Sequence, residues 1–421
     1  MPNAKKLLRP KYLYAAFALL AMVYLIGKAL VVGTDINVYL YASQQFFKGQ
    51  NIYSDNPYNF YLYSPLFAAL LGLISWMDWQ AARVIWLLFN VLLAYRSWVL
   101  LGLTFSAWPK LRPRFQSAYA WMLLLVSFGF LNHNFNLGQI SVLILWLSLE
   151  ATWRVQRGQP IRGAALLALG INIKILPLLV GYYWLAKGRV RASVYAGLFT
   201  ALTLLLPAML IGWQGNLALH EQWLTRIMPG GDNYVYETTN GCQSLNCLLA
   251  AYFYDFPEAE LSASYEAARK IARISEPTLS LMLQGSRIAL ALSILGLVVY
   301  SHRRRLPADR VLLWELAYVC LVTLLVFPHQ MKYAMLYFVP AGAYVIRYYL
   351  TLLSSGEKLR APEATLGLFS ALLMLVLALM GRDIVGDQIV NTLDYYHYMG
   401  LVNVLFLGVL WACRPDRFIA E

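Results

Sequence analysis

Asp35 is the acidic residue of this chain that is best placed for proton-transfer chemistry. It follows the first long apolar run, in Gly33-Thr34-Asp35-Ile36-Asn37, and directly precedes a short helix that we expect over residues 36–48. A carboxylate at the end of an apolar segment can act as a general base that removes a proton from a hydroxyl group. The alternative is an N-cap, because an Asp before a helix accepts hydrogen bonds from free backbone N–H groups. The sequence alone leaves both roles open.

Lys174 is the basic residue that most needs a partner. It lies inside an apolar stretch, in Gly170-Ile171-Asn172-Ile173-Lys174-Ile175-Leu176-Pro177. An ammonium group in apolar surroundings is costly unless it meets an anion, and a phosphate is the natural ligand. Asn172 beside it is a candidate substrate-binding residue. The alternative for Lys174 is that its stem is buried while the ammonium reaches out to water.

A short polar turn, Phe327-Pro328-His329-Gln330-Met331-Lys332-Tyr333, separates two apolar runs. His329 could orient Asp35 or contact a phosphate, and Lys332 adds a second cation. We therefore take His329 and Lys332 as candidate phosphate contacts. A histidine in a turn is otherwise simply solvated.

Aromatic rings and side-chain amides supply candidate sugar contacts. The segment after Asp35 is rich in tyrosine and phenylalanine, whose faces can stack on sugars but whose rings also settle at membrane interfaces. The turn over residues 132–139 carries several amides, which can recognise hydroxyl groups or cap a helix. From these two segments we select five substrate-binding candidates: Tyr39, Tyr63, Asn134, Asn136 and Gln139.

Residues 237–247 form a polar segment broken by Gly241, and Gln243 within it is a further substrate-binding candidate. Cys242 and Cys247 flank Gln243. They either form a short disulfide on an oxidising side of a membrane or remain thiols.

The composition decides the class of protein. Of the 421 residues 60% are hydrophobic and only 13% are charged, whereas soluble domains carry about 25% charged residues. This excludes disordered, collagen-like and small disulfide-rich proteins, and it argues against a water-soluble enzyme. The net charge of +13 would suggest a nucleic-acid partner in a soluble protein. Here we expect no nucleic acid, because the excess gathers in short segments between apolar runs.

The apolar runs predict an all-α polytopic membrane protein that forms a single integral membrane domain over residues 1–421. A run of 13 residues, 65–77, is too short to cross a bilayer and is expected to be an interfacial or re-entrant helix. Pro177 interrupts the stretch 163–187, which predicts two half-helices that meet inside the membrane. The ten candidate full spans are 12–32, 80–106, 117–131, 138–153, 191–212, 286–302, 309–327, 333–352, 364–382 and 397–413.

The basic residues predict the orientation, because cytoplasmic loops are enriched in Lys and Arg. Both termini are then cytoplasmic, and residues 33–79 and 213–285 form two long loops on the outer side, the second with an amphipathic helix over 257–277. The basic start is followed by an apolar run without a cleavage site, which we interpret as a retained anchor. The seven basic clusters are Lys5/Lys6/Arg9/Lys11, Lys110/Arg112/Arg114, Arg154/Arg157/Arg162, Lys187/Arg189/Arg191, Arg303/Arg304/Arg305/Arg310, Lys358/Arg360 and Arg414/Arg417.

Several motifs of other enzyme classes are absent from the sequence. It contains no Walker A motif, no HExxH, no CxxC, no nucleophile elbow and no paired-aspartate DxD. We therefore expect no metal and no cofactor.

The spacing of these residues resembles the family 87 glycosyltransferases of the GT-C superfamily. The similarity runs from Asp35 and Val38-Tyr39 through Tyr63-Ser64-Pro65, Asn136-Leu137-Gly138-Gln139-Ile140 and Lys174-Ile175-Leu176-Pro177 to Pro328-His329. Two departures stand out. Gly241-Cys242 separates Asn240 from Gln243-Ser244-Leu245, where the family has an unbroken Asn-Gln-Ser-Leu, and a single Pro65 stands where two prolines are common.

The resemblance implies a GT-C-type fold and an inverting, metal-independent transfer on the outer membrane face. The donor would be a polyprenyl-phosphate hexose, often mannose, and the acceptor a lipid or glycan. Asp35 would be the general base, Lys174 would contact the donor phosphate, and His329 would lie at that phosphate or beside Asp35.

Two other functions remain open at this point. A transporter or lipid flippase would use Lys174 and the broken helix as a substrate site, and a non-catalytic assembly subunit would need neither residue. The concentration of acidic and polar loops on the predicted outer side favours the enzyme.

Overall fold

The computed structural model describes residues 10–31, 34–54, 56–227, 241–254, 269–356 and 359–418. These residues are 79% helical and contain no strand, so the predicted all-α class is confirmed. The helices are α2 (Pro10–Val31), α3 (Thr34–Phe47), α4 (Pro65–Leu70), α5 (Gly72–Ser75), α6 (Trp79–Leu103), α7 (Pro113–Leu137), α8 (Ser141–Gln156), α9 (Pro160–Ile173), α10 (Leu178–Ala186), α11 (Val190–Leu205), α12 (Ala208–Ile227), α13 (Leu245–Phe253), α14 (Glu276–Arg303), α15 (Ala308–Val326), η2 (Lys332–Phe338), α16 (Val339–Ser355), α17 (Ala361–Leu379), α18 (Arg382–Val385), α19 (Asp387–Tyr395), α20 (Tyr398–Ala412) and η3 (Pro415–Phe418).

The chain is an integral membrane protein with several spanning helices. Within the described ranges, α6, α7, α14, α17 and the continuous segment η2–α16 are each long and apolar enough to cross a bilayer. Three bent pairs, α2/α3, α11/α12 and α19/α20, raise the count to eight if each pair is one span. The ten spans and broken pair expected from the sequence exceed this number. The predicted spans 138–153 and 309–327 correspond to α8 and α15, which are buried inside the bundle.

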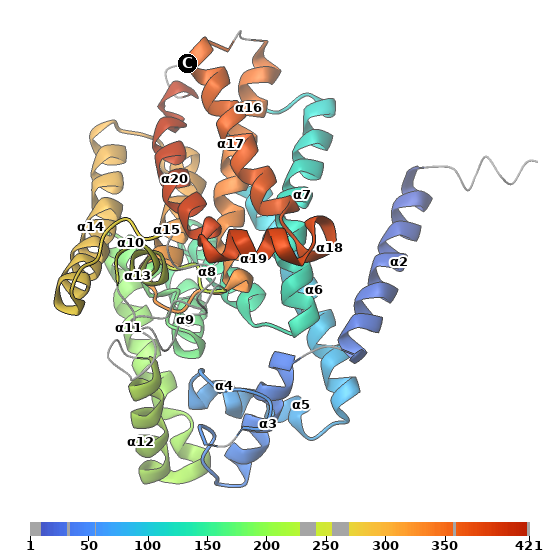
Figure 1. The fold of residues 1–421 in the computed structure, drawn as a ribbon, viewed down its shortest axis with the longest axis vertical. Helices are drawn as coiled ribbons and strands as arrows, with labels where there is room; N and C mark the ends of the chain where they lie inside the picture. The colour runs from blue at the N-terminus through green and yellow to red at the C-terminus, as the bar shows by residue number, and fades with distance from the viewer. Residues whose placement is uncertain are drawn as a thin grey trace, which may run out of the picture.

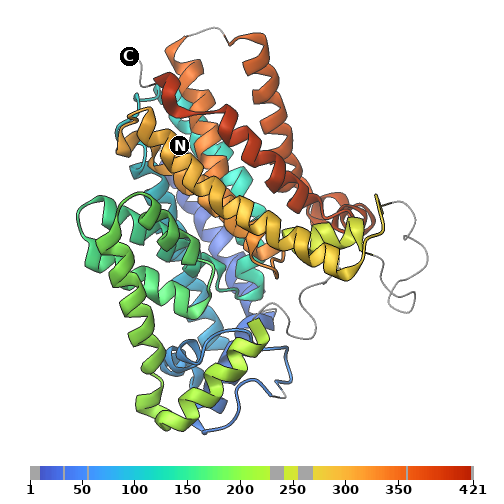
Figure 2. The ribbon, with the colours of Figure 1, turned by 90° about the vertical axis from the view of Figure 1, so that its left-hand side faces the viewer.

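The helices fall into two parts along the longest axis of the molecule. Helices α16, α17 and α20 lie together at one end, and α3, α4, α5 and α12 form the other end (Figure 1). Helix α2 stands at the side of the bundle against α6 and α7, and α19 lies across the ends of α17 and α20 (Figures 1 and 2). Helix α9 packs between α8 and α11.

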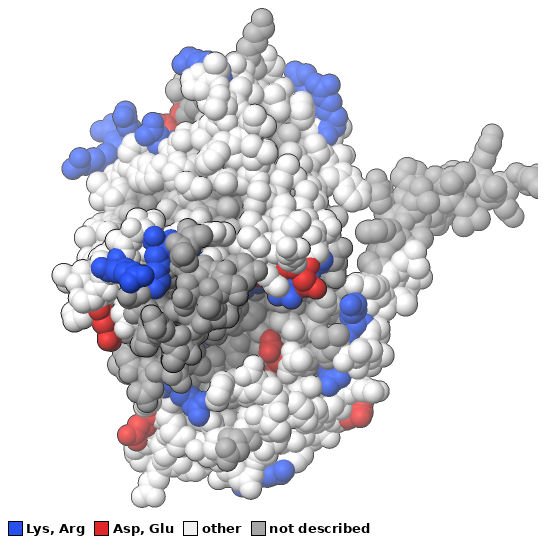
Figure 3. Space-filling model, in the orientation of Figure 1, with Lys and Arg blue, Asp and Glu red and all other residues white. Residues whose placement is uncertain are grey.

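The surface agrees with a membrane location. Where the face seen in Figure 3 is described, most of it is free of charged side chains, and Lys and Arg gather in small groups near its edges. Exposed leucines on the membrane-length helices α6, α14 and α17 account for part of this apolar surface. Burial of such side chains in lipid replaces burial in a protein core.

The helix break around Lys174 follows from local sequence. Helix α9 ends at Ile173, Lys174 has an extended backbone (φ −149°, ψ 122°), and α10 starts directly after Pro177. Proline lacks the N–H group that a continuous helix would need, so the helix ends before it. The predicted pair of half-helices is thus present as α9 and α10.

The long loop predicted over 213–285 is largely helical where it is described. Helix α12 turns by 94° from α11 and contributes residues up to Ile227, and α13 follows the segment around Gln243. Much of the expected amphipathic helix at 257–277 lies outside the described residues. Within its described part, residues 269–275 are not helical, and the last two residues already belong to α14, which begins at Glu276.

Cys242 and Cys247 form a disulfide, with their Cα atoms 6.0 Å apart. This decides between the two alternatives that the sequence left open. Cys320 and Cys413 are free and buried, as packing residues are expected to be.

Candidate functional site

Asp35 lies in the first turn of α3, where an acidic side chain is favoured by the helix dipole. Its carboxylate accepts a hydrogen bond from the Nε2 amide of Gln139. In the described part of the chain no backbone N–H of α3 donates to this carboxylate, so the side chain does not act as an N-cap there. Helix α3 bends by 58° from α2 and packs on α4 and α5, which places Asp35 beyond the end of the helix before it.

Gln139 links Asp35 to two tyrosines. Its Oε1 accepts a hydrogen bond from the Tyr39 hydroxyl at 3.3 Å, and the hydroxyls of Tyr39 and Tyr63 lie 3.0 Å apart. Gln139 is only 4% exposed, so both ends of its amide are used inside the protein. The result is a continuous hydrogen-bonded chain from the Asp35 carboxylate to Tyr63.

Helix α6 holds the elements that carry this chain in place. Trp86 donates its indole N–H to the carbonyl of Gly138 at 2.8 Å, and Arg83 donates to the Asn37 side chain at 3.0 Å. Gly138 ends α7 with φ +71°, and a Cβ there would come within 2.8 Å of Ile36. Only glycine permits both this backbone conformation and this contact between the end of α7 and the start of α3.

Lys174 reaches the same region from the break between α9 and α10. Its Nζ atom lies 5.8 Å from the ring centroid of Tyr63 and 5.1 Å from that of Tyr333, both suitable for cation–π contact. Its positive charge also attracts the Asp35 carboxylate. Among the described residues no carboxylate lies within ion-pair distance of Lys174.

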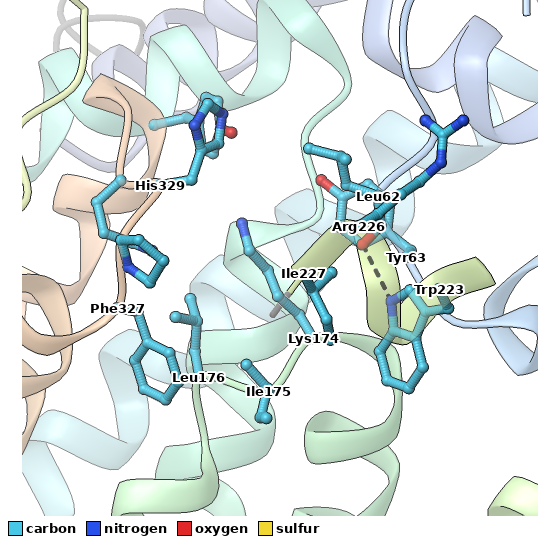
Figure 4. A pocket seen from close by; sticks show the side chains of 13 residues that line it. Leu62, Tyr63, Lys174, Ile175, Leu176, Trp223, Arg226, Ile227, Phe327 and His329 are labelled. Carbon is cyan, nitrogen blue, oxygen red and sulfur yellow. Dashed lines mark hydrogen bonds between the residues drawn. The ribbon is translucent and has the colours of Figure 1, made fainter. Parts of the chain in front are cut away.

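A pocket opens next to this cation. In Figure 4 the Lys174 side chain points into the space between His329 and Tyr63. Apolar and aromatic side chains make up most of the wall, and the described part of the lining contains no carboxylate. The lining residues are Leu62, Tyr63, Lys174, Ile175, Leu176, Trp223, Arg226, Ile227, Phe327, Pro328, His329, Gln330 and Tyr333.

Burial alters the acid–base properties of the groups around this pocket. Burial raises the pKa of Asp35, while the hydrogen bond from Gln139 and the charge of Lys174 act in the opposite direction. Burial also raises the pKa of Tyr63. The phenol of Tyr63 is therefore neutral and able to donate a hydrogen bond, and Asp35 binds a proton more readily than an exposed aspartate does.

The structure thus gathers five of the sequence candidates, Asp35, Tyr39, Tyr63, Gln139 and Lys174, and places His329 in the pocket wall. The other candidates lie elsewhere or are engaged in the fold.

Two asparagines hold backbone segments and helices together. Asn172 accepts a hydrogen bond from Ser64 at 2.9 Å and donates to Thr203 at 3.2 Å, which ties α9 to α4 and α11. Asn134 is buried and donates to the carbonyl of Tyr333 at 3.0 Å. Asn136 is half-buried, and its Oδ1 atom has no hydrogen-bond partner in the part of the chain that is described.

Lys332 and Gln243 are not part of the pocket lining. The charge of Lys332 acts on His133 and Asp394, and Lys332 is not part of the pocket lining. The Oε1 atom of Gln243 accepts hydrogen bonds from the backbone N–H groups of Met399 (3.1 Å) and Gly400 (3.3 Å) at the start of α20. Gln243 therefore joins the disulfide segment to that helix.

Sequence reasoning missed most residues of the pocket, among them Trp223, Arg226 and Tyr333. Trp223 and Arg226 are three positions apart on α12 and so share one face of the helix. That spacing of an aromatic and a basic residue was a usable signal. Tyr333 had none, because its contact with Lys174 depends on how the turn at 327–333 folds back on α9.

No group of three or more His, Cys, Asp or Glu side chains in the described ranges could hold a metal ion.

Comparison with known proteins assigns the family. A search of curated proteins gave no match. The sequence model of glycosyltransferase family 87 matches residues 61–328, which include Tyr63, Gln139 and Lys174 but neither Asp35 nor His329. This match covers more than half of the sequence. The chain, an integral membrane protein of α-helices, belongs to glycosyltransferase family 87 and is a glycosyltransferase.

Proposed function

We propose that the protein transfers a hexose, mannose being the first candidate, from a polyprenyl-phosphate donor to a lipid or glycan acceptor. The observation that carries the proposal is that Lys174, in the wall of an apolar pocket, lies near enough to Asp35, 139 positions away in sequence, to attract its carboxylate, in a family 87 glycosyltransferase. In this proposal Asp35 is the general base and Lys174 binds the donor phosphate.

The character of the pocket supports a lipid-linked donor. Leu176, Phe327 and Ile227 offer an apolar wall to the first isoprene units, and Lys174 offers an ammonium group to the phosphate. His329 in the same wall is the second candidate contact to that phosphate. A cation and an apolar surface side by side match an amphiphile with an anionic head better than they match a soluble nucleotide sugar.

The proposed reaction is one displacement at the anomeric carbon. The acceptor hydroxyl gives its proton to Asp35, its oxygen bonds to the anomeric carbon, and the bond from that carbon to the phosphate oxygen breaks. The electron pair leaves with the polyprenyl phosphate, whose negative charge Lys174 stabilises. A single displacement inverts the anomeric configuration, and this mechanism requires no metal.

Gln139 has a supporting part in this proposal. Because both ends of its amide are bound inside the protein, we assign it the role of orienting Asp35 rather than contacting substrate. The hydroxyl of Tyr39 continues the hydrogen-bonded chain from Gln139 to Tyr63, which lies in the pocket wall.

We also propose the sidedness from the sequence. Seven clusters of basic residues indicate cytoplasmic loops and cytoplasmic termini, which puts Asp35 at the outer face. The protein would then lie in the inner membrane of a bacterium as one integral domain. Membership of a glycosyltransferase family favours the function as an enzyme over the function as a transporter or flippase.

The test is a transfer assay with the purified full-length chain. Labelled polyprenyl-phosphate mannose is offered with a total lipid extract as the source of acceptors, and Asp35→Asn is compared with the wild type. The matched control is Asp78→Asn, because Asp78 is an exposed N-cap of α6 and asparagine caps equally well.

We expect Asp35→Asn to lose about 1,000-fold in rate, within the range of general-base catalysis, and Asp78→Asn to keep the wild-type rate. Undiminished transfer by Asp35→Asn would contradict the role of Asp35. Wild-type protein that accepts a nucleotide sugar but no polyprenyl-phosphate sugar would overturn the donor class.

A further inference from the structure

Three buried tyrosines form a row that starts at Tyr63 in the pocket wall and carries a cation at each end. The ring centroids of Tyr63 and Tyr61 are 5.7 Å apart, and those of Tyr61 and Tyr53 are also 5.7 Å apart. Lys174 lies over Tyr63 at 5.8 Å, and the Arg226 guanidinium lies over Tyr53 at 5.7 Å. The two cations are thus separated by the tyrosine row, and in Figure 4 they point in different directions.

Arg226 is fixed in position by its surroundings. Its Nη2 atom donates a hydrogen bond to the backbone carbonyl of Tyr53, and the guanidinium also lies 6.0 Å from the ring centroid of Phe60. One turn earlier on α12, Trp223 donates to the carbonyl of Leu62 at 3.3 Å. These contacts attach α12 to the loop after α3 and preorganise the guanidinium.

The charge of Arg226 is not neutralised within the described protein. No carboxylate lies within 4.0 Å of it in the described ranges, and the described pocket lining contains none. Other cations of the bundle differ, since Arg96 and Arg154 both pair with the buried Glu150 at 2.8 Å and 2.6 Å. A preorganised guanidinium without an acidic partner, at a pocket wall, is suited to bind an anion from outside the protein.

The surface around Arg226 indicates that this anion belongs to a lipid. Phe60, against which the guanidinium lies, is 69% exposed. Helices α4 and α5, at the same end of the molecule, and the first half of α12 itself expose large apolar side chains that suit contact with a membrane. These are Leu70, Leu73, Met209, Leu210, Trp213 and Leu217.

We infer that Arg226 binds the phosphate of an anionic acceptor lipid, at a subsite distinct from the donor-phosphate site at Lys174. The inference rests on the proposed function and names the acceptor class for the same pocket. The guanidinium offers a planar pair of N–H donors to the phosphodiester oxygens of the acceptor. The headgroup then extends through the pocket past Tyr63 and brings its hydroxyl toward Asp35.

The test measures binding, so that it does not depend on turnover. Detergent-solubilised full-length protein is titrated by native mass spectrometry with three probes: dioctanoyl phosphatidylglycerol, a neutral hexosyl diacylglycerol and farnesyl phosphate. The variants are Arg226→Ala, Arg226→Lys and Lys174→Met. Lys48→Ala is the control, because Lys48 is an exposed basic residue at the end of α3 outside this pocket.

We expect Arg226→Ala to weaken phosphatidylglycerol binding about tenfold or more, the loss expected for a hydrogen bond to a charged group. Its affinities for the neutral lipid and for farnesyl phosphate should stay within about twofold of wild type, a difference well under 1 kcal/mol. Arg226→Lys, which keeps the charge but loses the planar donor pair, should fall between wild type and Arg226→Ala. Lys174→Met should weaken the binding of farnesyl phosphate and leave the affinity for phosphatidylglycerol unchanged. Lys48→Ala should change none of the three affinities.

Equal weakening of all three probes in Arg226→Ala, with a lowered melting temperature, would assign Arg226 a structural role and overturn the inference. Weakened binding of farnesyl phosphate alone would place Arg226 at the donor and overturn it as well. Unchanged farnesyl phosphate binding in Lys174→Met would contradict the donor site of the proposed function, and it leaves the phosphatidylglycerol result to be judged independently.

Discussion

Two lysines flank helix α10, and their surroundings are opposite. Lys187, directly after the helix, forms an ion pair with Glu315 at 2.6 Å, and the same carboxylate accepts a hydrogen bond from Tyr183 at 2.7 Å. Lys174, before the helix, has aromatic rings around it and a pocket in front of it, and no described carboxylate lies within ion-pair distance.

We interpret Lys187 as a structural charge and Lys174 as a charge that is available to bind a ligand. A buried carboxylate such as Glu315, which is fully inaccessible, must be paired because an isolated buried charge is costly. Lys187 meets that need inside the protein. Lys174 has an open cavity where a partner would be, and a donor phosphate would complete it.

The largest effect is expected at the structural lysine. Lys187→Met leaves Glu315 buried without its cation, which should destabilise the fold by about 3 kcal/mol. The measurement is the melting temperature of the purified protein followed by tryptophan fluorescence. The double variant Lys187→Met/Glu315→Gln removes both charges and should recover most of the loss. Equal melting temperatures for wild type and Lys187→Met would remove the distinction between the two lysines.

A slightly smaller effect, of a different kind, is expected at Lys174. Lys174→Met keeps the length and apolar character of the stem but loses the charge, so transfer should fall by about 100-fold, equivalent to about 2.7 kcal/mol of transition-state stabilisation. The melting temperature should stay close to that of wild type. A variant that unfolds as Lys187→Met does, or that transfers sugar at the normal rate, would show that Lys174 is also a structural charge.

The smallest effect is expected at Gln139, the hydrogen-bond partner of Asp35. Gln139→Leu removes the hydrogen bond that favours the carboxylate of Asp35, so the pKa of Asp35 should rise above its already raised value. The acid limb of the pH–rate profile should move to higher pH, and the rate at neutral pH should fall by about tenfold, at the low end for acid–base catalysis.

The control for this prediction is the Michaelis constant. If Gln139 instead contacts substrate, Gln139→Leu will raise KM and leave the acid limb where it is. That result would contradict the orienting role.

Much of the fold could be predicted from the sequence because its signals are local. The apolar runs gave the helices, and Pro177 gave the break that frees Lys174. The full number of spans stays a prediction, since an apolar run such as 309–327 does not reveal whether it faces lipid or, like α15, other helices.

The site was harder to predict because its contacts are distant in sequence. Gln139 was selected as a sugar contact, yet it is bound at both ends between Asp35 and Tyr39. Lys332, chosen because it lies near His329, is not part of the pocket lining, and its charge acts on His133 and Asp394.

The sequence by itself determined that this is a helical membrane protein with few charges and that Asp35 and Lys174 are exceptional among them. Hydropathy and helix breaking act within a few residues and so can be read along the chain. Only the tertiary structure decided that Lys187 is paired, that Cys242 bonds to Cys247 and that Arg226 joins the pocket. Those outcomes depend on which helices pack together, and packing is set by the whole chain.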